Sequence, residues 1–290
     1  MEVYLVPRAK TTSMLPPIMS RALLACCRGR EARNTKPSVT PHASYRSSPS
    51  AILIASKFLA AIAVLAPGLI YSEETKLFMR EEFSSLENWA PFTFNKIHRS
   101  TDYSIESQGS ESSLRVLSND SASAIVYKYE FDVYQYPYMK WRWLISNVYR
   151  RGDAATKAGD DYPIRVYVIF GFDPSEASFR KRVQYAVYKA VNGRYPPASS
   201  LNYIWANKEA SSSILDNAYS EESKMIILQA GEEKAGVWVE ETVNILNDYQ
   251  RAFGSEPPSR ATIAIMGDAD DTRESSRAYV DFIEIFDTNE

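Results

Sequence analysis

Cysteine and histidine are scarce in this chain of 290 residues. Both cysteines, Cys26 and Cys27, lie near the N-terminus, and the two histidines are His42 and His98. Residues 73–290 therefore hold no cysteine and one histidine, which excludes a disulfide framework, a cysteine-based metal site and a multi-histidine zinc site there. A Ser-His or Cys-His catalytic pair in this region would have to use His98, which we interpret as a strand residue without a catalytic role.

Motifs that bind phosphate or activate a serine are missing as well. The sequence contains no phosphate-binding loop, no dinucleotide fingerprint and no nucleophile elbow. Residues 1–72 hold nine basic and two acidic side chains, whereas residues 73–290 hold 24 basic and 34 acidic side chains, a net charge of −10. Because an acidic body repels a phosphate backbone, we expect no nucleic-acid partner.

The N-terminal region has two parts. Residues 1–50 are basic and serine-rich, which is typical of a disordered leader such as a transit peptide, or of an upstream start codon that lengthens a shorter protein. Residues 51–72 are apolar apart from a few positions and indicate a signal peptide or a membrane anchor. The sequence thus predicts an exported protein, periplasmic or extracellular, that touches a membrane only through residues 51–70 if they stay uncleaved.

The body, residues 75–288, is predicted to be one all-β domain. Short runs rich in aromatic and β-branched residues alternate with turn residues, which favours an antiparallel β-sandwich. Helical spacing is limited to residues 176–191 and 246–253, the second followed by Gly254 as a stop signal, so we expect one or two short surface helices.

The most informative stretch is residues 138–170. Alternation places Met139, Trp141, Trp143 and Ile145 on one face of a strand, and a second strand follows a polar loop. That loop ends in the adjacent carboxylates Asp160 and Asp161, and Arg165 lies on the strand that leaves it. We expect the loop to present a charged pair at the rim of the sandwich.

A second acidic stretch follows a later strand. If the chain stays extended there, Asp268, Asp270 and Thr272 point the same way, an arrangement that suits a hard cation such as calcium. The alternative is an Asp-rich turn whose side chains cap their own backbone. If this stretch meets Asp160 and Asp161, the carboxylates require a cation, an arginine or shared protons. Arg165 could supply that charge, so a structural Asp–Arg–Asp network stays open beside a metal site.

Four aromatic residues are candidates for stacking on sugar rings. Tyr203 and Trp205 lie in the polar setting N-Y-I-W-A-N, whereas the face that carries Trp141 and Trp143 is otherwise apolar and favours the core. Trp238 lies beside two glutamates, and a pair of acids near a sugar platform could also cleave a glycosidic bond.

Six segments, taken in order, resemble one family: W-R-W, G-D-D-Y-P-x-R-V-Y-V-x-F, Y-I-W, G-V-W-V-E-E, D-Y-Q-R-A-F-G and I-A-I-M-x-D-x-D-D-T. The chain is similar from about Trp89 to Phe286 to a bacterial exported family catalogued as domain of unknown function number three thousand and forty-seven. The family pattern has Asn where this chain has Asp271. The resemblance implies a signal peptide and a jelly-roll-like sandwich, and it implies no reaction. The residues it carries over, without roles, are Asp160, Asp161, Arg165, Asp268, Asp270 and Thr272.

Three functions follow as hypotheses. The first is a binding protein that holds a carbohydrate or another polar ligand at an acidic, aromatic-edged site, with calcium as the candidate cofactor. The ligand site would comprise Asp160, Asp161, Arg165, Tyr203, Trp205 and Thr272, with Asp268 and Asp270 on the metal. The second is a carboxylate- or metal-dependent enzyme that acts on a glycan or an ester. The third is a structural envelope protein without a small ligand.

Overall fold

The computed structural model describes residues 75–94, 96–108, 111–175, 177–192 and 195–288. The predicted leader at 1–50 and the predicted signal peptide or anchor at 51–72 lie outside the described residues. Among the residues that are described, no helix is long and apolar enough to cross a membrane.

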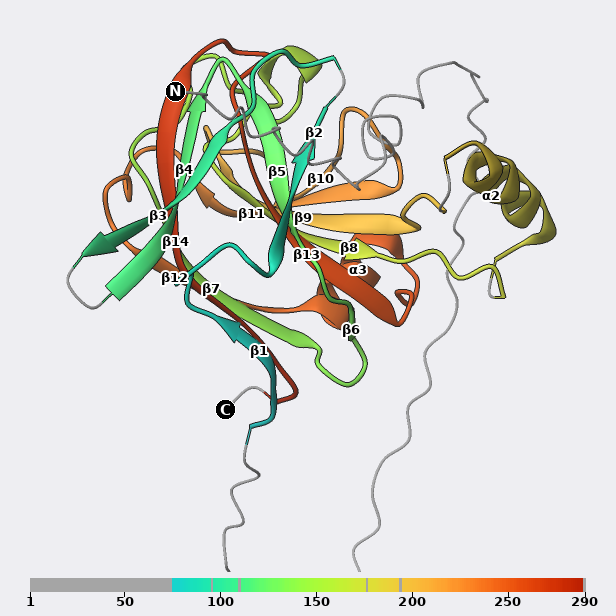
Figure 1. Ribbon diagram of the computed structural model, residues 1–290. Helices are drawn as coiled ribbons and strands as arrows, with labels where there is room; N and C mark the ends of the chain where they lie inside the picture. The colour runs from blue at the N-terminus through green and yellow to red at the C-terminus, as the bar shows by residue number, and fades with distance from the viewer. Residues whose placement is uncertain (1–74, 95, 109–110, 176, 193–194, 289–290) are drawn as a thin grey trace, which may run out of the picture. The chain divides into compact units, whose positions relative to one another are not determined.

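Sheet A contains six strands in the order β12-β7-β14-β4-β3, with β1 paired to β14. Their bounds are β1 (Leu77–Glu81), β3 (Asp102–Gln108), β4 (Glu111–Asn119), β7 (Tyr138–Ile145), β12 (Val239–Asn244) and β14 (Ser275–Phe286). Every pair in this sheet is antiparallel. The last strand of the chain, β14, lies inside the sheet between β7 and β4 (Figure 1).

Sheet B contains eight strands in the order β10-β11-β9-β8-β13-β5-β2, with β6 paired to β13. Their bounds are β2 (Trp89–Thr93), β5 (Ala122–Tyr127), β6 (Phe131–Asp132), β8 (Arg165–Phe170), β9 (Ser199–Ala206), β10 (Ile214–Asp216), β11 (Ser223–Ala230) and β13 (Arg260–Asp268). One pair, β9 with β11, is parallel, which departs from the fully antiparallel expectation. The cause is β10, which lies between them in sequence and runs antiparallel to β11 at the sheet's edge.

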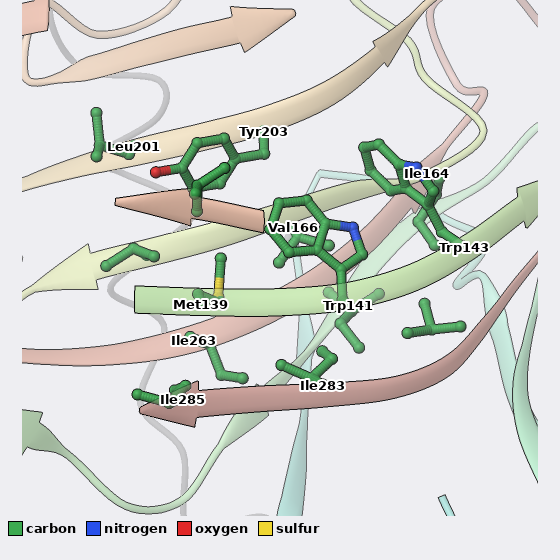
Figure 2. Close-up of a cluster of buried hydrophobic side chains, with 14 of the residues drawn as sticks. Met139, Trp141, Trp143, Ile164, Val166, Leu201, Tyr203, Ile263, Ile283 and Ile285 are labelled. Atoms are coloured by element: carbon green, nitrogen blue, oxygen red, sulfur yellow. The ribbon is translucent and has the colours of Figure 1, made fainter. Parts of the chain in front are cut away.

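The two sheets pack face to face around an aromatic core. In β7 the exposure alternates strictly, and Met139, Trp141, Trp143 and Ile145 are all buried, as the sequence pattern predicts. Figure 2 shows the Trp141 and Trp143 rings from sheet A lying against residues of sheet B, including Tyr203. The predicted β-sandwich is confirmed by these two packed sheets.

Two α-helices occur in the described residues, α2 (Phe179–Asn192) and α3 (Ile245–Phe253), together with a short 3-10 turn, η1 (Lys157–Gly159). Both α-helices fall where the sequence spacing predicts them. The Asn244 side chain caps α3 by accepting a hydrogen bond from the Asn247 amide, and Gly254 ends it with a left-handed φ of 70°.

Candidate functional site

The two acidic stretches meet because their strands are neighbours. β8 begins at Arg165, shortly after Asp160 and Asp161, and β13 ends at Asp268. These strands pair antiparallel with Arg165 opposite Met266, so the entry to β8 and the exit from β13 lie at the same end of sheet B. We call the group that converges there the acid cluster: Asp160, Asp161, Asp268 and Asp270.

Arg165 is the positive charge inside the cluster. Its Nε donates to Asp268 Oδ1 at 3.0 Å, and a terminal nitrogen pairs with Asp268 Oδ2. The same terminal nitrogen donates to the backbone carbonyl of Asp160 at 2.7 Å, and the other lies 3.6 Å from Asp160 Oδ1. The guanidinium carbon lies 4.5 Å from the centroid of the Tyr162 ring. The Arg165 side chain is only 4% exposed, and the carboxyl groups that it contacts are buried as well. The charge of Arg165 therefore compensates carboxylates that have little access to water.

Asp161 fixes the turn that follows β13. Its Oδ2 accepts a hydrogen bond from the Thr272 amide at 2.5 Å, and its Oδ1 accepts one from the Asp271 amide at 3.4 Å. Its own carbonyl accepts from the Asn207 side chain at 2.6 Å. Residues 270–273 therefore form a turn rather than the extended segment that the sequence suggested, closed by a hydrogen bond from the Arg273 amide to the Ala269 carbonyl. The amide donors of the turn are satisfied by a carboxylate from another loop.

Three carboxylates of the cluster lie close enough to share one ion. Asp161, Asp268 and Asp270 each offer an oxygen within 4.8 Å of the others. Calcium binds oxygen ligands at about 2.4 Å, so oxygens up to about 4.8 Å apart can surround one calcium ion. The Thr272 hydroxyl belongs to the same turn, is buried, and interacts with the Asp161 carboxylate. These four side chains are the ones that could hold a metal.

Burial raises the free energy of the ionised carboxylates in the acid cluster. Desolvation raises the pKa of the Asp160 and Asp161 carboxyl groups, although Arg165 and the Thr272 amide oppose the rise. Desolvation and the neighbouring charges of Asp161 and Asp271 raise the pKa of Asp270 to about 6. When all four of its carboxyl groups are ionised, the cluster carries more negative charge than Arg165 neutralises.

Tyr219 is a residue of this site that sequence reasoning missed. Its hydroxyl donates to Asp271 Oδ2 at 2.8 Å and lies 3.3 Å from the Lys157 carbonyl oxygen. Burial and the hydrogen bond to Asp271 raise the pKa of the Tyr219 hydroxyl, which therefore stays a donor. The Lys157 ammonium lies 5.1 Å from the centroid of the partly exposed ring. No local pattern marks Tyr219, because it lies in a loop between β10 and β11 that sheet pairing brings here.

Tyr203 and Trp205 are not part of the cluster. Both are fully buried in the core, where Tyr203 contacts Trp141 and Trp205 contacts Trp143, with ring centroids 5.5 and 5.8 Å apart. Tyr203 also donates a hydrogen bond to Asp248 on α3 at 3.1 Å. A ligand on the surface cannot stack on either ring, so the aromatic platform suggested for these two residues is wrong, and Tyr219 is the aromatic residue at the edge of the site.

Solved structures match the chain at low identity and with TM-scores below 0.5. The glycoside hydrolase domain of Endo-D from Streptococcus pneumoniae R6 is 8% identical, with a TM-score of 0.31, over 70% of this chain and 22% of its own. The family GH12 endoglucanase 3 of Trichoderma harzianum is 10% identical, with a TM-score of 0.34, over 71% of this chain and 95% of its own. A Caldicellulosiruptor saccharolyticus carbohydrate-binding module in complex with mannohexaose is 9% identical, with a TM-score of 0.31, over 73% of this chain and 97% of its own. The chain thus spans less than a quarter of the Endo-D domain.

Sequence comparison gives a more direct assignment. No curated protein matches the chain. A family model described as "Protein of unknown function (DUF3047)" matches residues 87–284, which include every strand of the sandwich except β1 and the last two residues of β14, and every residue of the acid cluster. The chain therefore belongs to this family, as the ordered motifs of its sequence indicate.

Proposed function

We propose that this protein binds a divalent cation of the calcium type in the acid cluster and, through it, a polyhydroxylated ligand such as a glycan. The observation that supports the proposal best is the approach of oxygens from Asp161, Asp268 and Asp270 to within 4.8 Å of one another. Carboxylates this close together need a compensating positive charge.

Charge and ligand type both favour calcium over a transition metal. The four carboxylates of the acid cluster carry four negative charges when ionised, and Arg165 supplies one positive charge, so a divalent ion would neutralise two of the three charges that remain. All candidate ligand atoms are oxygens, which hard cations prefer, and the described residues bring no histidine or cysteine to the cluster.

A cation bound by these residues would keep open coordination positions. Calcium takes about six to eight oxygen ligands, more than three carboxylates and one hydroxyl provide if each binds through one oxygen. Asp270 is partly exposed, and the exposed Asp271 carboxylate and the Tyr219 ring lie beside it. Neighbouring hydroxyl groups of a sugar could complete the coordination while the carboxylates accept their hydrogen bonds.

We also propose that the chain is exported. The support is the apolar stretch at residues 51–72. Calcium modules that work outside cells need only weak affinity, about 0.1 to 1 mM, because the ion is plentiful there.

A structural role is the second candidate, and one observation favours it directly. The oxygens of Asp268 bind Arg165, and those of Asp161 bind the turn after β13, so the cluster already ties two loops together. In that case the protein would need neither a cation nor a ligand.

Calcium titration of chelator-treated protein separates the two candidates. We expect calorimetric binding and a rise in unfolding free energy of about 2.7 kcal/mol when calcium is at a hundred times its dissociation constant. Asp270→Asn should abolish both effects, whereas Asp102→Asn, which removes an exposed aspartate paired with Arg115, should leave them unchanged. Folded protein that shows no calcium-dependent stabilisation would support the structural role.

A further inference from the structure

A second polar pocket lies on the outer face of sheet A. It has a volume of about 170 Å³ and crosses the strands β3, β4, β14 and β7 as far as the segment that enters β12. The residues that the argument uses are Glu106 of β3, Tyr279 and Asp281 of β14, Arg142 of β7, and Trp238 next to β12. We call it the sheet A pocket. None of its residues belongs to the acid cluster.

The carboxylates of this pocket outnumber its cations. Glu106, Glu111 and Asp281 line it together with one basic residue, Arg142, so its net charge is −2 when all are ionised. A terminal nitrogen of Arg142 lies 2.6 Å from Asp281 Oδ2, and the Tyr279 hydroxyl donates to Glu106 Oε2 at 3.4 Å. Ionised carboxylates only accept hydrogen bonds, so the pocket favours a ligand rich in donors and repels anions.

A β-bulge and a buried donor show that Arg142 and Asp281 are specifically placed. The register of β14 against β7 shifts between Val280 and Phe282, so Asp281 is the extra residue of a bulge. Bulges re-aim side chains, and this one brings Asp281 onto Arg142 at the floor of the pocket. The Nε of Arg142 is buried and has no hydrogen-bond partner among the described residues. A ligand cannot reach this buried atom, but the Arg142 side chain is 37% exposed, so a bound hydroxyl group could accept a hydrogen bond from a terminal nitrogen.

Trp238 is the aromatic wall of the pocket. It is 38% exposed, whereas the other tryptophans, all in the described part of the chain, are 4% exposed or less. The Arg142 guanidinium carbon lies 5.2 Å from the Trp238 ring centroid, and the Tyr279 ring centroid lies 6.3 Å from it. The indole is thus held in place by its neighbours and still open to solvent.

We propose that the sheet A pocket binds one pyranose ring of a neutral glycan, independently of any cation at the acid cluster. The C–H face of the sugar would lie against Trp238, its hydroxyls would donate to Glu106 and Asp281, and one hydroxyl oxygen would accept from Arg142. The volume is below the roughly 300 Å³ of pockets that enclose drug-sized molecules, so one ring enters and the rest of the glycan extends over the sheet.

Fluorescence of Trp238 tests this proposal on the whole folded protein. Acrylamide should quench mainly Trp238, because the remaining indoles are buried. The probes are cellohexaose, mannohexaose and xylohexaose, each with and without a calcium chelator, and tetramethylammonium as a cationic probe. We expect at least one hexasaccharide to protect Trp238 from acrylamide, equally well with the chelator present.

Variants test whether the protection of Trp238 arises from binding in the sheet A pocket. Asp281→Asn keeps the shape of the side chain and should weaken the protecting sugar about tenfold, because a hydrogen bond to a charged acceptor is lost. Trp238→Phe, followed by calorimetry, should weaken it as well, whereas Tyr129→Ala, at an exposed tyrosine outside the pocket, should not change it. The proposal is overturned if no hexasaccharide protects Trp238 at millimolar concentration, or if tetramethylammonium protects it and the sugars do not. Loss of protection on adding chelator would overturn its independence from the cation.

Discussion

The aromatic core and the most buried residues of the acid cluster are both closed to water but are held together differently. Trp141 and Asp161 are both 0% exposed. Trp141 packs edge-on against Trp143 with ring centroids 5.4 Å apart, and its stability comes from apolar area and shape. Asp161 depends on two amide donors and on the charge of its neighbours. The packing of the Trp141 ring therefore does not depend on protons or ions, whereas the acid cluster responds to both.

The largest expected effect tests the core. Trp141→Ala should lower the free energy of unfolding by about 4 kcal/mol, because it removes a buried indole and leaves a cavity between the sheets. Urea unfolding at pH 5 and pH 7.5 should give the same loss at both, since no titrating group contacts the ring through a hydrogen bond in the described structure. A loss that differed strongly between the two pH values would show that the packing of Trp141 depends on protonation, as the acid cluster does.

The next effect tests the acid cluster by removing the positive charge of Arg165. Arg165→Met should lower the free energy of unfolding by about 3 kcal/mol at pH 7.5, because Asp268 and Asp160 would be left buried without a counter-charge. The loss should shrink towards pH 4 as the carboxyl groups take up protons. Arg115→Met, which breaks an exposed pair with Asp102, is the matched control and should cost less than about 1 kcal/mol. Equal losses in the two variants would show that Arg165 stabilises the protein no more than an exposed ion pair does.

The smallest effect concerns Asp270, whose pKa is raised from 3.8 to about 6. The folded protein binds this proton more tightly than the unfolded chain, so the contribution of Asp270 to stability is present below pH 4 and is lost as pH rises through 6. Calcium-free protein should thus become less stable over this window, and Asp270→Asn should flatten that part of the curve. Thermal unfolding followed across the window measures it. A wild-type curve that stays flat, or rises, in the absence of calcium would contradict the raised pKa.

Much of the sandwich is predictable from sequence because the alternation of apolar and polar residues along a strand indicates which face is buried. The alternation at Met139–Ile145 predicts which side chains of β7 enter the core, and the spacing before Gly254 predicts α3. Tyr203 and Trp205 were harder to interpret because β9 lies inside sheet B and is buried on both faces, so alternation is lost. Their polar neighbours then suggested an exposed strand.

The acid cluster was only partly predictable. Each acidic stretch is visible beside its strand, but their meeting depends on β8 and β13 being neighbours, and sequence does not report strand pairing. The turn after Asp268 depends in addition on Asp161, which satisfies its amides from another loop. Tyr219 and the sheet A pocket combine residues from three or more separate segments, and nothing local to any one of them marks the whole.

The position of β14 has a consequence for how this chain acquires its fold. Its residues bridge β7 and β4 and also pair with β1, the first described strand. Sheet A therefore has no continuous middle until residues 275–286 are made, because before then β3–β4 and β7–β12 are two separate pairs, each with an open edge. The twelve residues of β14 are thus what joins the two halves of sheet A.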